Sequence, residues 1–188
     1  MTSITKGLLI LFSSFMITAC GSFSDPIKQL SNNNESLTLG DTVTKTIKTK
    51  ELYGAWAVAS DSASNDPTKI LYLVVLLPNH SGVNYMTIEN KKADVDATFY
   101  EFYNWRFNEK EKIMTMNSFE RTSIENGQKK VEKINESVNY DTQLYKHEGE
   151  ILAIKFSGAD GEYTFLRMDD ETYREVVKDI PGIPPLKR

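Results

Sequence analysis

The amino-acid sequence predicts an all-β protein, an antiparallel up-and-down barrel of about eight strands followed by a short C-terminal helix. Short runs of apolar or alternating residues recur about every 8–15 residues, a spacing typical of antiparallel barrels and sandwiches. The dipeptides Asn126-Gly127 and Asp160-Gly161 are strong signals for hairpin turns. Helical spacing is found only in Asp170–Asp179. A β-sandwich is the alternative, because strand spacing alone does not separate the two architectures.

The expected strands follow one another along the middle of the chain. The first, Leu52–Ala59, ends at a polar loop before Pro67. The second is the apolar run Lys69–Leu77, which stops at the turn-forming stretch Pro78–Gly82. Six more strands are expected at Val83–Glu89, Ala97–Phe107, Ile113–Ser123, Lys129–Tyr140, Leu152–Ser157 and Tyr163–Met168.

The expected helix, Asp170–Asp179, is short and amphipathic. Tyr173, Val176 and Val177 recur at helical spacing. Its first turn is acidic, and the helix dipole favours negative charge at that end. The helix therefore closes the ordered part of the chain, and the stretch 181–188, which is rich in proline, is expected to be a tail.

The first twenty residues are typical of a targeting segment. The positive Lys6 precedes the apolar run Gly7–Ile17, which is too short to span a membrane as a helix. Ile17-Thr18-Ala19-Cys20 resembles the bacterial lipobox, in which small residues precede a cysteine that receives a diacylglycerol. This resemblance implies cleavage before Cys20 and anchoring by the attached lipid. An ordinary secretory signal with a chance cysteine is the alternative.

These patterns divide the chain into four parts. Residues 1–19 are the expected lipoprotein signal peptide, and residues 20–50 are the lipidated N-terminus and a flexible tether. Residues 51–180 form the expected barrel domain, and 181–188 the tail. Part of Leu37–Ile47 could still pair with the edge of the barrel. Gly21 stands where an aspartate would resemble an inner-membrane retention signal, so the resemblance implies a bacterial cell envelope and, with two membranes, the outer one.

Composition excludes several classes of function. The chain has 188 residues, of which 40% are hydrophobic, and a formal net charge of −4, which argues against a nucleic-acid partner. Its single cysteine, Cys20, leaves no internal disulfide and no cysteine-rich metal site. His80 and His147 are expected in solvated turns, and Asp94 and Asp96 in a solvated loop that could at most hold a cation weakly. We find no catalytic motif, so we expect neither an enzyme nor a cofactor or metal.

Gly54-Ala55-Trp56 in the first strand and Arg167 in the last, followed directly by a helix, resemble the lipocalin-like domains of small bacterial lipoproteins. The resemblance implies that Trp56 closes the barrel floor and that Arg167 stacks on the indole. The chain departs from the lipocalins in lacking their T-D-Y motif and a disulfide. A narrow barrel filled by its own side chains therefore stays open as an alternative.

Glu101 stands in a densely aromatic strand, and simple alternation places it on the same face as Tyr103 and Trp105. With Met114 and Met116 nearby, these residues are candidates for a ligand pocket. A β-bulge near 101–102 would instead return Glu101 to solvent, and we favour this second interpretation. The leading function is the binding of a small apolar ligand without catalysis. An interaction module, such as an inhibitor or immunity-type lipoprotein, and a structural envelope lipoprotein are the alternatives.

Overall fold

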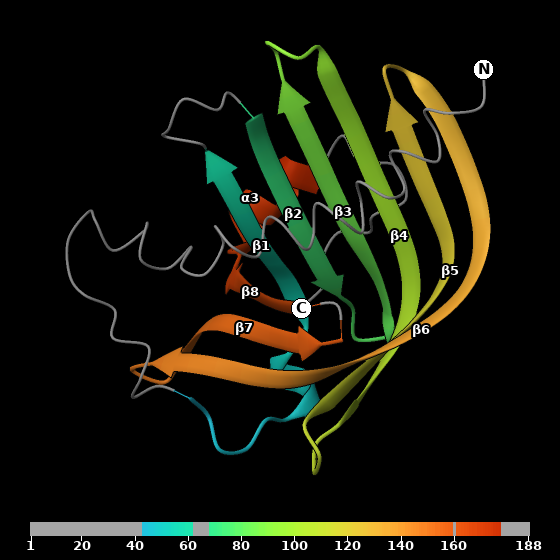
Figure 1. Ribbon diagram of the computed structural model, residues 1–188. Helices are drawn as coiled ribbons and strands as arrows, with labels where there is room; N and C mark the ends of the chain where they lie inside the picture. Colours follow the sequence, from blue (N-terminus) through green and yellow to red (C-terminus); the bar gives the residue numbers. More distant parts are fainter. Residues whose placement is uncertain (1–42, 62–67, 160, 178–188) are drawn as a thin grey trace.

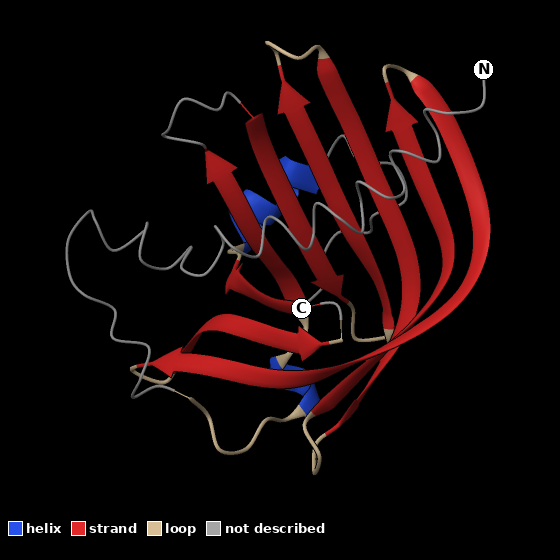
Figure 2. Cartoon of the chain, in the orientation of Figure 1, coloured by secondary structure: helices blue, strands red, loops and turns tan. Residues whose placement is uncertain are grey.

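A computed structural model describes residues 43–61, 68–159 and 161–177 (Figure 1). Strands dominate this part of the chain, as Figure 2 shows. The elements are η2 (Thr49–Glu51), β1 (Gly54–Asp61), β2 (Thr68–Leu76), β3 (Ser81–Asn90), β4 (Val95–Asn108), β5 (Ile113–Glu125), β6 (Gln128–His147), β7 (Glu150–Gly158), β8 (Gly161–Arg167) and α3 (Asp170–Val177).

The strands form a closed antiparallel barrel in the order of the sequence, from β1 to β8 (Figure 1). Each strand pairs with the next, and β8 pairs with β1 through Trp56↔Arg167 and Ala57↔Leu166. The predicted all-β barrel with one short C-terminal helix is confirmed, and the sandwich is wrong because the sheet closes on itself. The expected strands all form, although β6 extends well beyond the predicted Lys129–Tyr140.

The barrel wall is uneven in height. The seam between β1 and β8 consists of only two residue pairs, and β7 pairs with β6 only from Asp141 to His147. From Gln128 to Tyr140, β6 pairs with β5 and with no other described strand. The barrel is therefore closed at one end, and beyond that level the strands β1–β6 stand as one open, curved sheet, as Figure 1 shows.

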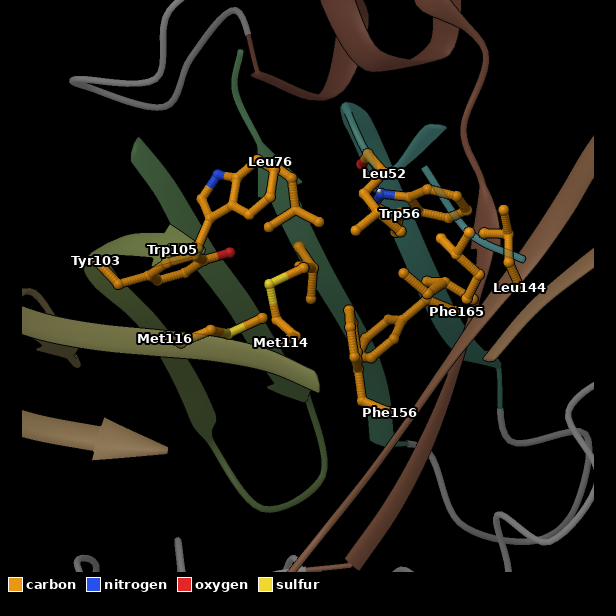
Figure 3. Close-up of a cluster of buried hydrophobic side chains, with 13 residues drawn as sticks. Leu52, Trp56, Leu76, Tyr103, Trp105, Met114, Met116, Leu144, Phe156 and Phe165 are labelled. Carbon is orange, nitrogen blue, oxygen red and sulfur yellow. Dashed lines mark hydrogen bonds between the residues drawn. The ribbon is translucent and has the colours of Figure 1, made fainter. Parts of the chain in front are cut away.

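Apolar side chains fill the closed end (Figure 3). They alternate along the strands with outward-facing residues, as the period of two in a β-strand requires. Trp56, Leu76, Leu144, Phe156 and Phe165 are all buried in this core cluster. Tyr72 packs edge-on against Phe165, with ring centroids 5.1 Å apart.

A second apolar cluster lies on the outer face of the wall. Leu73 and Val75 occupy the alternate positions of β2 and therefore face away from the interior. Tyr173 of α3 is fully buried against them. Asp169 caps this helix, because its Oδ1 accepts hydrogen bonds from the backbone N–H groups of Glu171 (3.0 Å) and Thr172 (2.8 Å).

The segment that precedes β1 contacts the barrel, which corrects the expected domain start at Glu51. Val43 forms a β-bridge with Tyr145, and Ile47 is 1% exposed in the interior core. Burial of the apolar Ile47 thus holds against the barrel a segment that its polar composition had indicated to be part of the tether. The suggestion that part of Leu37–Ile47 pairs with the barrel edge is confirmed for Val43.

Two carboxylates fasten η2 to the wall. Glu109 accepts hydrogen bonds from the backbone N–H of Thr49 (2.8 Å) and from Lys48 Nζ (3.2 Å). Glu51 accepts from the backbone N–H of Lys48 at 2.7 Å and pairs with Lys146 of β6. Burial raises the pKa of Glu51, but the hydrogen bonds from Lys146 and Lys48 outweigh it, so the pKa lies below its ordinary value.

The signal peptide, Cys20 and the tail 181–188 lie outside the described residues, and their assignments stay predictions. Within residues 43–61, 68–159 and 161–177, no helix has the length and apolar character needed to cross a bilayer.

Candidate functional site

The closed end carries the predicted tryptophan–arginine pair. Trp56 is fully buried, and its indole N–H donates a hydrogen bond to the Leu52 carbonyl at 3.0 Å. The Arg167 guanidinium carbon lies 4.5 Å from the centroid of the indole ring, in the geometry of a cation–π contact. The expected stacking is confirmed, and Trp56 lies at the start of β1 where η2 meets the barrel.

Gly54 is required beside this pair. Its φ angle is +133°, a conformation that residues with a side chain rarely adopt. A Cβ atom at this position would lie 2.5 Å from Nη2 of Arg167. The glycine therefore gives the guanidinium the space that it needs to lie across the indole.

Four of the five candidate pocket residues belong to the packed core instead of an open pocket. Tyr103 and Met114 are 0% exposed, Trp105 2% and Met116 6% (Figure 3). The Tyr103 hydroxyl donates to the Val75 carbonyl at 3.2 Å, and the Trp105 indole N–H donates to the Ser81 carbonyl at 3.0 Å. These side chains fill the closed end, where aromatic and methionine side chains pack against one another.

Glu101 faces the interior, so the favoured interpretation was wrong. The register of β4 with β5 shifts between Phe102 and Tyr103, but the extra residue, Phe119, belongs to β5. Alternation along β4 is therefore kept, and Glu101 shares the inward face of Tyr103. Its side chain is 22% exposed, one inward position beyond the packed core.

An ionic cluster surrounds Glu101. Its Oε1 accepts a hydrogen bond from the Ser118 hydroxyl at 2.7 Å, and its Oε2 accepts from Nε and Nη2 of Arg121 at 2.8 and 2.6 Å. Nη2 of Arg121 also donates to Oε2 of Glu136 at 2.9 Å. Burial lowers the pKa of Arg121, but the charge and hydrogen bonds of Glu101 outweigh it, so the guanidinium pKa lies above its ordinary value.

Sequence reasoning missed Asn84 and Arg121, which flank Glu101. The register places Asn84 of β3 opposite Glu101, and Glu101 opposite Arg121 of β5. Residues that are opposite each other in antiparallel strands share one face of the sheet. The side-chain oxygen of Asn84 is buried and accepts no hydrogen bond from the described part of the chain. Pairing β3 with β4 by alternation could have found Asn84, whereas the bulge at Phe119 conceals Arg121.

Next to this cluster, the inward face of the open sheet is apolar. We call this surface the concave face, and we define it by the apolar residues at inward positions of β2, β3 and β4 that are partly exposed. In register, Tyr72 lies opposite Met86, and Met86 opposite Phe99. The residues of the concave face are Ile70, Tyr72, Met86, Ile88 and Phe99.

The loop between β3 and β4 borders a hollow of about 400 Å³, lined by Thr87, Ile88, Glu89, Asn90, Lys91, Asp94, Val95 and Asp96. Despite Asp94 and Asp96, the described residues hold no group of three or more side chains suited to a metal ion.

His80 packs its ring against Trp105 at a centroid distance of 4.8 Å, and His147 is exposed beside Glu148.

No family model, no curated protein and no solved structure matches this chain.

Proposed function

We propose that the protein is a lipid-anchored, non-enzymatic binding protein of the bacterial cell envelope, and that its concave face binds the apolar part of a small ligand. One observation carries this proposal: inward-facing apolar side chains such as Met86 and Phe99 keep part of their surface accessible above a fully packed floor. Interior apolar surface that the described residues leave partly accessible is typical of ligand sites.

Burial of an apolar ligand on this face would be favourable. Each methylene group removed from water contributes about 0.8 kcal/mol. The inward side of β3, which includes the concave face, extends from Asn84 to Asn90, a rise of about 20 Å at 3.3 Å per residue. An alkyl chain or a flat apolar ring system has room to lie along it.

The binding proposal is tested by displacement of a fluorescent apolar probe from the full chain, with Cys20→Ala to prevent lipidation. Met86→Gln changes the concave face without changing its volume greatly, and we expect several-fold weaker probe binding because a thioether sulfur and its methyl group are replaced by an amide. Thr87→Gln is the matched control, since Thr87 faces outward at the adjacent position of β3. Equal probe affinity in both variants would contradict the proposal.

The anchoring proposal rests on the lipobox resemblance alone and needs a separate test. The intact mass of the protein from its own membranes should exceed that of the polypeptide from Cys20 onward by the mass of the attached acyl chains. Two or more acyl chains give stable anchoring, whereas one is marginal. A mass equal to the bare polypeptide would contradict lipidation.

A second candidate function, binding of another protein, is favoured by the edge of β6. From Gln128 to Tyr140 this strand has no second described neighbour, and an unpaired edge is a template for an added strand. Native mass spectrometry of the protein purified from its own host separates the two candidates. A bound small molecule supports ligand binding, and a stoichiometric protein neighbour supports the interaction module.

A further inference from the structure

Polar side chains next to the concave face indicate the chemistry of the ligand's head group. We propose, on the basis of the proposed ligand-binding function, that the concave face takes an amphiphile whose head group is a protonated amine. Two neighbouring features carry this inference. The side-chain oxygen of Asn84 accepts no hydrogen bond from the described residues, and beside it Glu101, Arg121 and Glu136 form an ionic cluster with an excess of carboxylate.

The first argument is charge. One guanidinium, Arg121, lies between two carboxylates, those of Glu101 and Glu136. Its Nε and Nη2 atoms already donate hydrogen bonds to these carboxylates, with donor–acceptor distances of 2.6–2.9 Å. The three side chains together carry one net negative charge. The neighbouring inward pair on β6, Lys130 with Glu132, adds no net charge.

This balance discriminates against an anionic head group. A fatty-acid carboxylate would lie beside two carboxylates that already accept hydrogen bonds from Nε and Nη2 of Arg121. Like charges at such short range disfavour binding, and a partly buried site screens them less than bulk water does. A cationic head group gains from the same field.

The second argument is hydrogen bonding, and it is independent of charge. The side-chain oxygen of Asn84 is buried and accepts no hydrogen bond from the described residues. A buried acceptor without a donor is costly, and a ligand that supplies the donor removes that cost. An ammonium group has three donors, so it can serve Asn84 and Glu101, which lie opposite each other, at once.

The register also orients the ligand. Met86 is two residues beyond Asn84 on β3, toward the open edge of the sheet, and Phe99 lies opposite Met86. A head group at Asn84 therefore places the apolar chain against Met86 and Phe99, about 7 Å farther along the strand. The ligand enters head first, and its apolar tail points toward the open end.

The test compares three probes with the same alkyl chain: dodecylamine, dodecanol and dodecanoic acid. Each displaces a fluorescent apolar probe from the full chain carrying Cys20→Ala, at neutral pH and below micelle formation. We expect the amine to bind about tenfold more tightly than the acid, with the alcohol between them, as one charge-assisted hydrogen bond would give.

Two variants separate the two arguments. Glu101→Gln with Glu136→Gln removes the negative charges and should abolish the preference for the amine over the alcohol. Asn84→Leu removes the acceptor and should weaken the amine and the alcohol together. Because the whole chain has a net charge of −4, a general attraction for cations must be excluded. Glu120→Gln on the outer face and the exposed Asn104→Leu are the matched controls, and both should keep the preference.

The outcomes distinguish the head-group inference from the proposed function. If the acid binds as tightly as the amine, or if Glu120→Gln abolishes the preference as fully as the inner double variant, the head-group inference is wrong and ligand binding stands. If none of the three alkyl probes displaces the fluorescent probe, the proposed function itself fails. Far-UV circular dichroism of each variant confirms that the barrel is folded.

Discussion

Replacing Trp56 by alanine tests whether the closed end depends on this side chain. The indole is 0% exposed within the core, donates a hydrogen bond to Leu52 and lies under the Arg167 guanidinium. Truncation of a large buried aromatic residue costs about 3–5 kcal/mol. The cation–π contact supplies about 0.5–2 kcal/mol of that loss, depending on desolvation. We therefore expect Trp56→Ala to lower the free energy of unfolding by about 4 kcal/mol.

The assay is urea unfolding followed by far-UV circular dichroism, because tryptophan fluorescence would lose one of its two reporters, Trp56 and Trp105. Arg167→Met separates the two contributions, since methionine keeps much of the apolar contact and removes the cation. This variant should lose only about 0.5–2 kcal/mol. A loss below about 1 kcal/mol for Trp56→Ala would refute the assignment of Trp56 as the plug of the barrel.

Three further predictions concern the turns and ends that hold the barrel. Gly54→Ala should destabilise the protein by more than Gly127→Ala in urea unfolding, because both have positive φ but only the Cβ at Gly54 meets Arg167. Asp169→Ala should cost about 1 kcal/mol in the same assay, since it removes the cap of α3; an unchanged midpoint would contradict the cap. The pKa of Glu51 lies below its ordinary value, so its contribution to stability is fully present above the ordinary value and is lost as pH falls through the folded-state pKa. The melting temperature of Glu51→Gln should accordingly depend less on pH than that of the wild type below about pH 5, and parallel curves would contradict this coupling.

The architecture could be predicted from the sequence because its signals are local. Alternation, the Asn126-Gly127 turn and the terminal helix each depend on a few neighbouring residues. The pairing of Trp56 with Arg167 could be predicted only through resemblance, because the two residues lie far apart in the sequence and meet through the closing seam. The uneven height of the wall was not predicted, since it depends on which residues of β6 find a second partner.

The candidate site was predicted in part. Alternation correctly placed Glu101 with Tyr103 and Trp105, but it could not show how far the packed core extends along β4. Burial depends on what the opposite strands contribute, so Tyr103 and Trp105 became core and Glu101 lies just beyond them. The bulge was expected in the wrong strand because the sequence of β4 holds no sign of the extra residue in β5, Phe119.

The separation of the core from the concave face makes the functional proposals testable. Residues that stabilise the fold, such as Trp56 and Phe165, are buried at the closed end. Met86 and Asn84 lie instead on β3, which pairs with β2 on one side and with β4 on the other. Substitutions of distant residues without shared partners have nearly additive effects on stability. A change at Met86 should therefore alter probe affinity while the unfolding midpoint moves little, and the reverse should hold at Trp56. Were both measurements to move together in both variants, the open sheet and the closed end would be one cooperative core, and the concave face would serve packing instead of ligand binding.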